Sequence, residues 1–322
     1  MKLNHYQILV RIGLISIIII GILVWKSTIT NKLSLMQIVM CDVGQGDGIL
    51  FSKGSFQILV DAGPDEAILA CLSKVMPPLD TSLEVVIATH ADADHIGGMK
   101  HVFQQYQISL LLTPAWGRST QVYTDFLSSV RQQISHGLKV YSPQAGDVIH
   151  FGPDIWCNII SPEKAWGDPN LFLMPTTETQ LLDILALQSD DERATNDGSI
   201  GTILYYGQVS VLLTGDMEML AEKAALKAGL IPDVDMLKVG HHGAKTSTSE
   251  EFLRVSKPEM SLVSAGRKNS YGHPAAEVIT RLRSVGSQVK QTNEHGAITV
   301  MSDGTSYWLS GDEKKYGQAS AR

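Results

Sequence analysis

Cysteine is scarce in this sequence, with only three in 322 residues, at Cys41, Cys71 and Cys157. So few and so widely spaced cysteines supply neither a disulfide framework nor a CxxC zinc knuckle. We therefore expect three buried thiols, with one bridge between two of them as the alternative. Hydrophobic residues make up 44% of the chain and charged residues 18%, which fits a globular protein with a sizeable core, in one large domain or two.

Positive charge is also sparse, with 26 lysines and arginines against 33 aspartates and glutamates. Four of these bases precede Asp42, so the rest of the chain carries 22 bases against 33 acids, or about −11. That balance argues against indiscriminate nucleic-acid binding, which needs positive charge facing phosphates. Residues 253–291 are an exception and predict either a local basic face or the solvated surface of helices. Their bases are Arg254, Lys257, Arg267, Lys268, Arg281, Arg283 and Lys290, and their acids are Glu259 and Glu277.

One hydrophobic run is long, IGLISIIIIGILVW at residues 12–25, and it contains no charge. It is short for a membrane-spanning helix, which needs about 20 residues, and it also fits the apolar part of a signal peptide. Because no cleavage site follows it, we predict an uncleaved N-terminal transmembrane anchor over residues 1–32 and keep a cleaved signal peptide as the alternative. The flanking bases Lys2, Arg11, Lys26 and Lys32 are nearly balanced, so they indicate the orientation only weakly.

Strand and helix signals alternate along the remaining residues, 33–322, and predict one α/β domain. Residues 163–195 interrupt this rhythm with prolines and an acidic run, and we predict an inserted loop or lid there. The helix that follows residues 83–90 is expected to begin near Ile96. The predicted strands are 34–41, 48–53, 56–61, 83–90, a hairpin around Gly207, 234–239 and three near the C-terminus, and the predicted helices include 65–75 and 218–228.

Three polar motifs each follow an apolar strand: HADADH at 90–95, TGD at 214–216 and GHHG at 240–243. Loops at strand ends converge on one edge of a layered sheet protein, where α/β sites are built. These residue types bind divalent metals, and their number suffices for two ions. The candidate ligands are His90, Asp92, Asp94, His95, Asp216 and His242.

Asp216 is the candidate for a carboxylate shared between two metals. A carboxylate at the end of an apolar strand is costly to bury unless it is paired or bound to a metal. The alternative is that Asp216 caps the helix that begins near Glu218. We expect His242 to complete the second metal and His241 to contact the substrate, although the order of the two could be reversed.

Six motifs carry a resemblance that covers residues 35 to 309 in order. They are DVGQGD (42–47), LVDAG (59–63), THADADHIGG (89–98), TGDM (214–217), LKVGHHG (237–243) and YGHP (271–274). Together they resemble the metallo-β-lactamase-fold domain at the C-terminus of ComEC-type DNA-uptake proteins. The resemblance implies a four-layer αββα sandwich with a dinuclear metal site. It also implies that H-x-D-x-D-H is the expected form of the motif, so Asp92 does not indicate a metal site that has lost its function.

The ligand set departs from that of other members of the fold. Asp92 stands where a second histidine is familiar, which makes the site more oxygen-rich and moves its preference from zinc alone toward manganese or magnesium. We expect two divalent ions, Mn²⁺ or Zn²⁺. The stretch NDGSIGTI offers Asn196 and Ser199 but no middle histidine, which leaves the first metal with His90, Asp92 and Asp216.

Other residues are candidates for contact with the substrate. His273 could donate a proton to a leaving alkoxide or contact a phosphate oxygen, and its alternative is a structural role in a turn that starts a helix at Pro274. Lys245 follows Ala244, where ComEC-like domains usually have serine, and could stabilise developing charge. Asp61 is expected to orient a ligand histidine. The catalytic candidates are His241, His273, Lys245 and Asn196.

The function implied by the resemblance is metal-assisted hydrolysis of a DNA phosphodiester. Two metals would lower the pKa of a bridging water and form hydroxide, which attacks phosphorus. The expected location is the outer face of a membrane, with DNA as substrate and DNA-uptake channel proteins as partners. Two alternatives stay open: a hydrolase of a small ester, lactone or phosphocholine-type substrate, and a non-catalytic binding module whose metal is structural.

Overall fold

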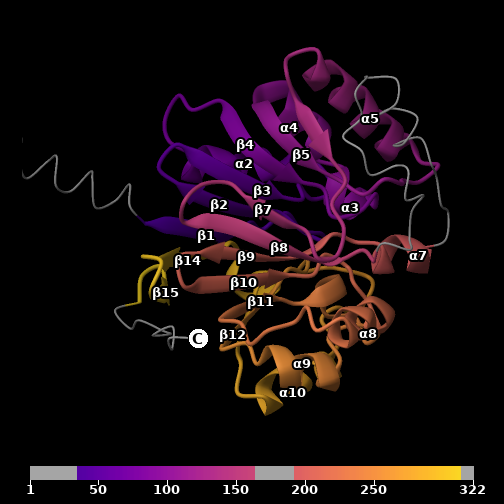
Figure 1. Cartoon of the computed structure of the whole chain (residues 1–322), viewed down its shortest axis with the longest axis vertical. Helices are drawn as coiled ribbons and strands as arrows, with labels where there is room; N and C mark the ends of the chain where they lie inside the picture. The colour runs from indigo at the N-terminus through magenta and orange to yellow at the C-terminus, as the bar shows by residue number, and fades with distance from the viewer. Residues whose placement is uncertain (1–34, 164–191, 313–322) are drawn as a thin grey trace, which may run out of the picture.

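The computed structural model describes residues 35–163 and 192–312, which form two β-sheets packed face to face between two layers of helices (Figure 1). The αββα sandwich predicted from the resemblance is therefore confirmed. The predicted anchor at residues 1–32 and most of the predicted insertion lie outside the described residues. Within the described ranges, no helix is both long and apolar enough to cross a membrane.

The first sheet has eight strands in the order β15-β14-β1-β2-β3-β4-β5-β6. Its strands β3 to β6 run parallel, and the other neighbours are antiparallel. The strands are β1 (Met36–Met40), β2 (Ile49–Lys53), β3 (Phe56–Val60), β4 (Ser82–Ile87), β5 (Gln107–Leu112), β6 (Lys139–Tyr141), β14 (Ile298–Ser302) and β15 (Tyr307–Leu309).

The second sheet has seven strands in the order β13-β12-β11-β10-β9-β8-β7. Strands β10 to β13 run parallel, and the predicted hairpin around Gly207 is confirmed as the antiparallel pair of β9 and β10. The strands are β7 (Val148–His150), β8 (Ile155–Ser161), β9 (Gly201–Tyr206), β10 (Val209–Leu213), β11 (Met236–Lys238), β12 (Met260–Val263) and β13 (Gln288–Gln291).

Alternation along the strands divides the core into three apolar layers. In β1, Met36 and Ile38 face the second sheet, whereas Val39 faces the helices, as the two-residue period of a strand requires. Helices α2 (Ala67–Val75), α4 (Met99–Gln105) and α5 (Gln121–Ile134) cover the first sheet. Helices α8 (Met219–Lys227), α9 (Glu250–Ser256) and α10 (Ala276–Ser284) cover the second sheet.

Helix α5 shows how the sequence builds one of these layers. The Thr120 hydroxyl accepts a hydrogen bond from the backbone N–H of Tyr123 and so caps the first turn. Tyr123, Phe126 and Val130 recur at helical spacing and are buried against the first sheet.

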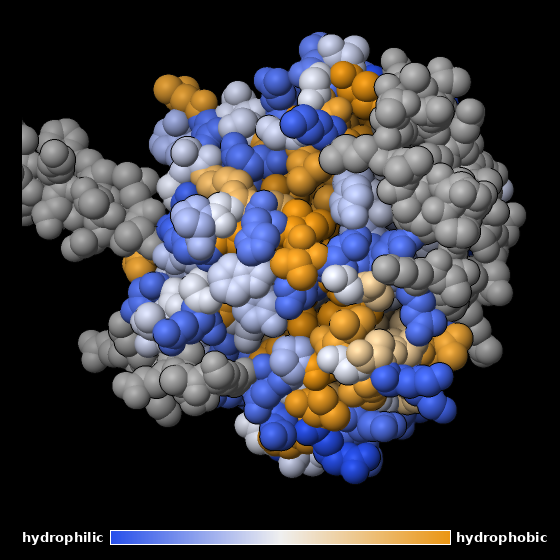
Figure 2. Space-filling view, viewed as in Figure 1, coloured by the Kyte–Doolittle hydropathy of each residue, from blue (hydrophilic) through white to orange (hydrophobic). Residues whose placement is uncertain are grey.

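Apolar residues also gather on the surface over α8 and α9 (Figure 2), where Leu220 is 62% exposed.

Four predicted boundaries are corrected by the structure. Strand β4 ends at Ile87, before His90. The helix after it begins at Ala93 rather than near Ile96, because α3 (Ala93–Ile96) forms a first turn ahead of α4. Pro274 precedes α10, which begins at Ala276, so the proline does not start the helix. The C-terminal end of the predicted insertion is helical, as α7 (Glu192–Asp197).

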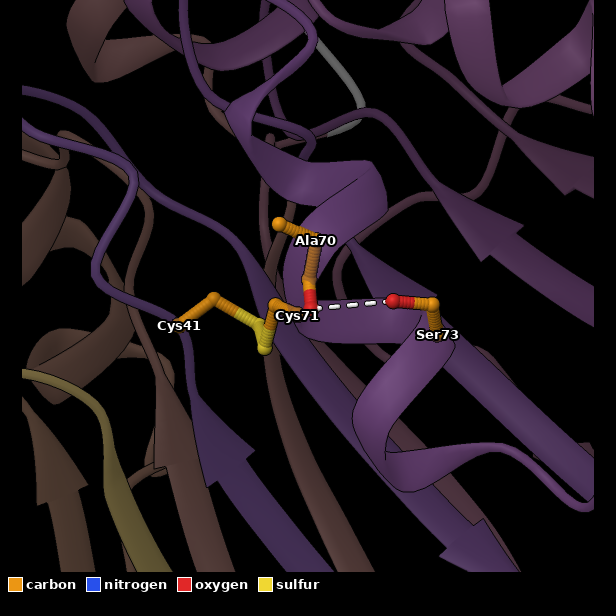
Figure 3. The surroundings of a disulfide bond; sticks show 4 residues. All are labelled: Cys41, Ala70, Cys71 and Ser73. Carbon is orange, nitrogen blue, oxygen red and sulfur yellow. Dashed lines mark hydrogen bonds between the residues drawn. A yellow bond between two sulfur atoms is a disulfide. The ribbon is translucent and has the colours of Figure 1, made fainter.

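The expectation of three buried thiols is wrong, because Cys41 and Cys71 form a disulfide (Figure 3). Their Cα atoms lie 5.9 Å apart and the bridge spans 30 residues of sequence. The pairing arises because β1 ends beside α2, where the tertiary fold brings the two sulfurs together. Cys157 is a buried thiol, as expected.

Candidate metal centre

The three polar motifs meet at the carboxyl ends of β4, β10 and β11, near α3 and α8 on the right of Figure 1. Asp216 lies at the centre of the group. Its Oδ1 is 3.3 Å from Nε2 of His95, and its Oδ2 is 3.6 Å from Nε2 of His242. His241 and His90 approach the same Oδ2 through Nε2 at 3.7 and 3.9 Å. Side chains from two separate segments thus surround the buried carboxylate of a third, as the sequence predicted.

An unusual backbone conformation presents the histidine pair. His241 and His242 have φ of 45° and 54° inside the turn η3 (Gly240–Gly243). Left-handed backbone is costly for residues other than glycine and persists where the surroundings impose it. Here the Ser247 hydroxyl closes the turn by donating to the carbonyl oxygens of Gly240 and Ala244 at 2.7 and 3.0 Å. The conformation directs the two imidazoles into the group of carboxylates.

One set of ligand atoms is well formed. Atoms of Asp94, His95 and His242 lie within 4.8 Å of one another, and Asp94 Oδ2 is 3.2 Å from Nε2 of His242. Asp216 adjoins this set through both of its oxygens. All four are candidate ligands from the sequence, which assigned His242 to the second metal. The geometry places His242, rather than His241, beside Asp94.

The other set is less complete. His90, His95 and Asp216 form a second group within 4.8 Å. Asp92 is in none of the ligand groups found among the described residues, and its Oδ1 accepts a hydrogen bond from Arg118 Nη1 at 2.7 Å. Its Oδ2 lies 3.9 Å from Nε2 of His90. Arg118, which the sequence analysis missed, therefore holds the carboxylate that replaces the second histidine.

Three buried atoms test whether these residues fit a metal. Nε2 of His90, Nε2 of His95 and Oδ1 of Asp216 have no hydrogen-bond partner in the described part of the chain. Buried polar atoms normally have one, and leaving them unsatisfied is costly. Two imidazole nitrogens and a carboxylate oxygen converge here, and that combination of ligands suits a divalent transition metal. The donor set fits the ions that the fold implies.

Asp61 fixes the orientation of His95, as the sequence predicted. Its Oδ2 is 2.7 Å from Nδ1 of His95. The same carboxylate accepts hydrogen bonds from the backbone N–H and the hydroxyl of Thr89 at 2.8 and 2.7 Å. An imidazole that donates from Nδ1 to a carboxylate is left with Nε2 as its ligand atom.

Asp47 and Lys238 form a buried ion pair that the sequence analysis did not identify. The Lys238 ammonium contacts the Asp47 carboxylate, donates to the carbonyl oxygen of Gly215 at 2.8 Å, and lies 3.7 Å from Asp216. Asp47 also lies 3.4 Å from Nδ1 of His242. The only sequence signal was a lysine at the end of an apolar strand. The DVGQGD motif thus supplies a side chain to the centre in addition to its glycines.

Gly46 explains why that motif must contain glycine. Its φ is +127°, and a Cβ atom there would lie 2.0 Å from the carbonyl oxygen of Asp94. The neighbouring N–H of Asp47 donates to that same oxygen at 3.2 Å. The loop therefore packs directly under the ligand-bearing turn, which only glycine allows at this position.

The carboxylates control the protonation of the histidines. Burial opposes charge on His242, but Asp216 and Asp47 prevail and raise its pKa to about 9. Burial likewise opposes charge on His95, and Asp216 and Asp61 raise its pKa well above the usual range. His90 differs, because burial and the neighbouring His95 lower its pKa to about 4. Protons on His95 and His242 thus offset negative charge where a metal would do so.

His241 and His273 face the cavity from the second sheet. Glu218 Oε1 lies 3.1 Å from Nδ1 of His241 and so orients that ring. The His273 ring meets the His241 ring edge-on, with centroids 5.5 Å apart. Burial is the main cause that lowers the pKa of His273, with His241 adding to it. The cavity of about 410 Å³ is lined by both rings, by Arg118, and by Asp92, Asp94, Asp216 and His242.

Two predicted catalytic residues lie apart from this cavity. The Lys245 ammonium is exposed and lies 3.8 Å from Glu277 on the surface. Asn196 is buried in α7, and its Oδ1 has no hydrogen-bond partner in the described ranges. The nearby Ser199 hydroxyl accepts a hydrogen bond from the backbone N–H of Asp216 at 3.3 Å. The structure brings the other predicted residues together.

A two-sheet sandwich with a histidine and aspartate metal centre at the carboxyl ends of its strands defines a class of metal-dependent hydrolases. The sequence profile of the metallo-beta-lactamase superfamily matches residues 41–267, and the chain belongs to this superfamily. The fold implies divalent metal ions, typically Zn²⁺. The family predicted from the six motifs is confirmed.

Curated relatives agree with this assignment. The chain is 27% identical to ComE operon protein 3 of Bacillus subtilis, over 81% of this chain and 32% of that protein. It is 30% identical to Recombination protein 2 of Haemophilus influenzae, over 82% of this chain and 28% of that protein. It is 25% identical to Competence protein ComA of Neisseria gonorrhoeae, over 81% of this chain and 31% of that protein. The chain spans about a third of the length of these relatives.

Proposed function

We propose that this metallo-beta-lactamase-fold hydrolase is a phosphodiesterase that cleaves DNA at a dinuclear centre. The observation that carries the proposal is the convergence of unsatisfied atoms of His90, His95 and Asp216 beside an accessible cavity. The names of two relatives, Recombination protein 2 and Competence protein ComA, support a role in handling DNA. The motif resemblance to ComEC-type proteins supports the same substrate.

The metals would be held by Asp94, His95 and His242 on one side and by His90 on the other, with Asp216 between them. Divalent ions in such a centre lower the pKa of a water molecule and polarise a phosphoryl oxygen. Asp61 keeps Nε2 of His95 directed inward, and Glu218 does the same for His241.

His273 and Arg118 contribute the polar contacts at the cavity walls. Burial lowers the pKa of His273 and so favours the neutral imidazole, which has a single N–H to donate to a phosphate oxygen. This favours contact with phosphate over full proton transfer. Arg118 adds positive charge to the lining of the cavity while it holds Asp92 in place.

A small-molecule hydrolase is the second candidate. The charge balance of about −11 beyond the first 41 residues favours it, because an acidic domain repels a polyanion. A binding module with a structural metal is the third candidate. The open positions left in the ligand set and the accessible cavity oppose it, since structural sites are usually closed by protein ligands.

The deciding experiment follows cleavage by the full-length protein after metal removal and reloading with manganese or zinc. Single-stranded DNA, duplex DNA and bis-p-nitrophenyl phosphate serve as substrates. We expect metal-dependent DNA cleavage that Asp94→Asn abolishes and the exposed control Asp312→Asn retains. Cleavage of the small diester alone would move the assignment to the second candidate. A metal-loaded protein that cleaves none of them contradicts the phosphodiesterase.

We also propose that residues 1–32 anchor the domain to the outer face of a membrane. The uncharged run at 12–25 supports the anchor. The Cys41–Cys71 disulfide supports an oxidising compartment, where such bridges persist. Fractionation with alkali extraction, followed by protease treatment of intact cells, tests this location. Release of the protein by alkali, or its protection from external protease, would contradict the proposal.

A further inference from the structure

Tyr271 is an exposed aromatic residue at the edge of the cavity. It is 71% exposed and belongs to the residues that line the cavity. Its ring stacks on that of His273, with centroids 5.8 Å apart and an angle of 26° between the planes. A large exposed ring that is already stacked on one face presents its other face to solvent. Tyr271 belongs to none of the three apolar layers of the core.

The loop that carries Tyr271 is held in a defined shape. The Asn269 side chain donates to the carbonyl oxygens of Gly266 and His273, each at 2.7 Å, and accepts from the N–H of His273 at 3.0 Å. Gly266 packs so closely on the backbone of Gln45 that a Cβ atom there would lie 2.9 Å from its nitrogen. These contacts hold the loop at both of its ends, so binding to a side chain on it would cost little ordering of the backbone.

A series of side-chain contacts links the exposed ring of Tyr271 to the metal centre. His273 meets His241 edge-on, and Nε2 of His241 lies 3.7 Å from Asp216. The same loop carries two exposed bases, Arg267 and Lys268. Of the seven bases between residues 253 and 291, these two share a loop with a cavity-lining aromatic ring. Aromatic and basic side chains in this combination suit a nucleic acid strand.

We propose that the stacked pair of Tyr271 and His273 binds an unstacked base next to the scissile phosphate, while Arg267 and Lys268 contact the backbone of the same strand. This inference rests on the proposed phosphodiesterase and deepens it by naming single-stranded nucleic acid as the preferred substrate. Every nucleobase has a face that stacks on an aromatic ring, so the platform is tolerant of sequence. In a duplex those faces are covered by neighbouring bases, so the ring of Tyr271 adds nothing to the binding of duplex DNA.

Binding measurements test the pair of Tyr271 and His273 independently of DNA cleavage. The metal-loaded full-length protein is titrated with labelled phosphorothioate oligonucleotides, one of thymidines and one with the same backbone but abasic. We expect the thymidine strand to bind about tenfold or more tightly than the abasic strand. Tyr271→Ala should remove most of that difference, Tyr271→Phe should restore it, and the exposed control Leu79→Ala should leave it unchanged.

The basic residues Arg267 and Lys268 should affect binding differently from Tyr271. The double variant with Arg267→Gln and Lys268→Gln should weaken both oligonucleotides alike. It should also reduce the slope of log affinity against log salt by about 1.4, the loss of two single-strand phosphate contacts.

Several outcomes would overturn the platform. They are equal binding of the two oligonucleotides by the wild type, equal losses for both in Tyr271→Ala, and no binding of either. Selective binding of the thymidine strand without any metal-dependent cleavage would instead contradict only the proposed phosphodiesterase.

Discussion

Arg118 donates a hydrogen bond from Nη1 to Oδ1 of Asp92 at 2.7 Å, so one of the six predicted ligands is already engaged by the protein. Burial raises the pKa of Asp92, and Arg118 opposes that shift. Asp94, two residues later, contacts His242 instead. The two aspartates of one motif therefore have different surroundings, and we expect different contributions to metal binding.

Replacing these two aspartates should change the metal content unequally. Asp94→Asn removes an oxygen from the group formed with His95 and His242, so it should lose at least one ion per chain. Asp92→Asn should lose less, because that carboxylate stands outside the groups and is held by Arg118. Mass-spectrometric metal analysis of purified protein measures both, with Asp312→Asn as the control. Equal losses in the two variants would contradict this difference.

Metal affinity should increase with pH up to about 9. Burial opposes the shift, but Asp216 and Asp47 raise the pKa of His242 from 6.5 to about 9 in the metal-free protein. The proton therefore stabilises the metal-free fold fully below pH 6.5, and this stabilisation is lost as the pH rises through 9. A metal needs the neutral imidazole and competes with that proton.

Titration of the metal-free protein against a competing chelator across this pH range measures the dependence. The difference in melting temperature between loaded and metal-free protein should widen over the same range. An affinity that stays constant between pH 6.5 and 9 would show that protons on this histidine do not oppose the metal.

Lys238→Met should destabilise the metal-free protein by about 3–5 kcal/mol, because removal of one partner leaves buried charge uncompensated. The carboxylates affected are Asp47 and Asp216. Loading with metal should recover part of the loss, since the ion supplies positive charge to the folded state alone. Urea unfolding with and without metal measures both effects.

Lys245→Met, which removes an exposed ammonium, is the matched control and should change the free energy of unfolding little. Similar losses in the two variants would contradict the role of Lys238.

Loss of the Cys41–Cys71 bridge should lower the free energy of unfolding by about 2–4 kcal/mol. The bridge closes a loop of 30 residues. Its Cys41 immediately precedes the DVGQGD motif, in which the N–H of Asp47 donates to the carbonyl oxygen of Asp94. Urea unfolding of the double serine variant, and of wild type with reductant, should agree. Cys157→Ala should keep the reductant-dependent difference, because its thiol is outside the bridge. A Cys157→Ala protein that no longer responds to reductant would contradict this pairing.

The local parts of this protein could be predicted from its sequence because they depend on short spacings. Alternation along residues 36–40 and helical spacing along residues 67–75 are local properties of the backbone. The three motifs follow β4, β10 and β11, so their convergence follows from the layered fold. Boundaries were less exact, because caps such as Asp92 and Ala275 depend on the turns around them.

Apart from Asp61, which the sequence predicted, the partners of the ligands came from the tertiary structure alone. Asp94 and His242 are separated by 148 residues, and Asp92 is held by an arginine 26 residues away that belongs to no motif. Lys238 becomes a counter-charge only when β11 lies beside β10 in the sheet. Strand order and the layering of loops decide such contacts, and neither appears in residue spacing. The sequence alone determined the class of fold and the ligand types, whereas sheet order decided which carboxylate faces which cation, because charges interact through space rather than along the chain.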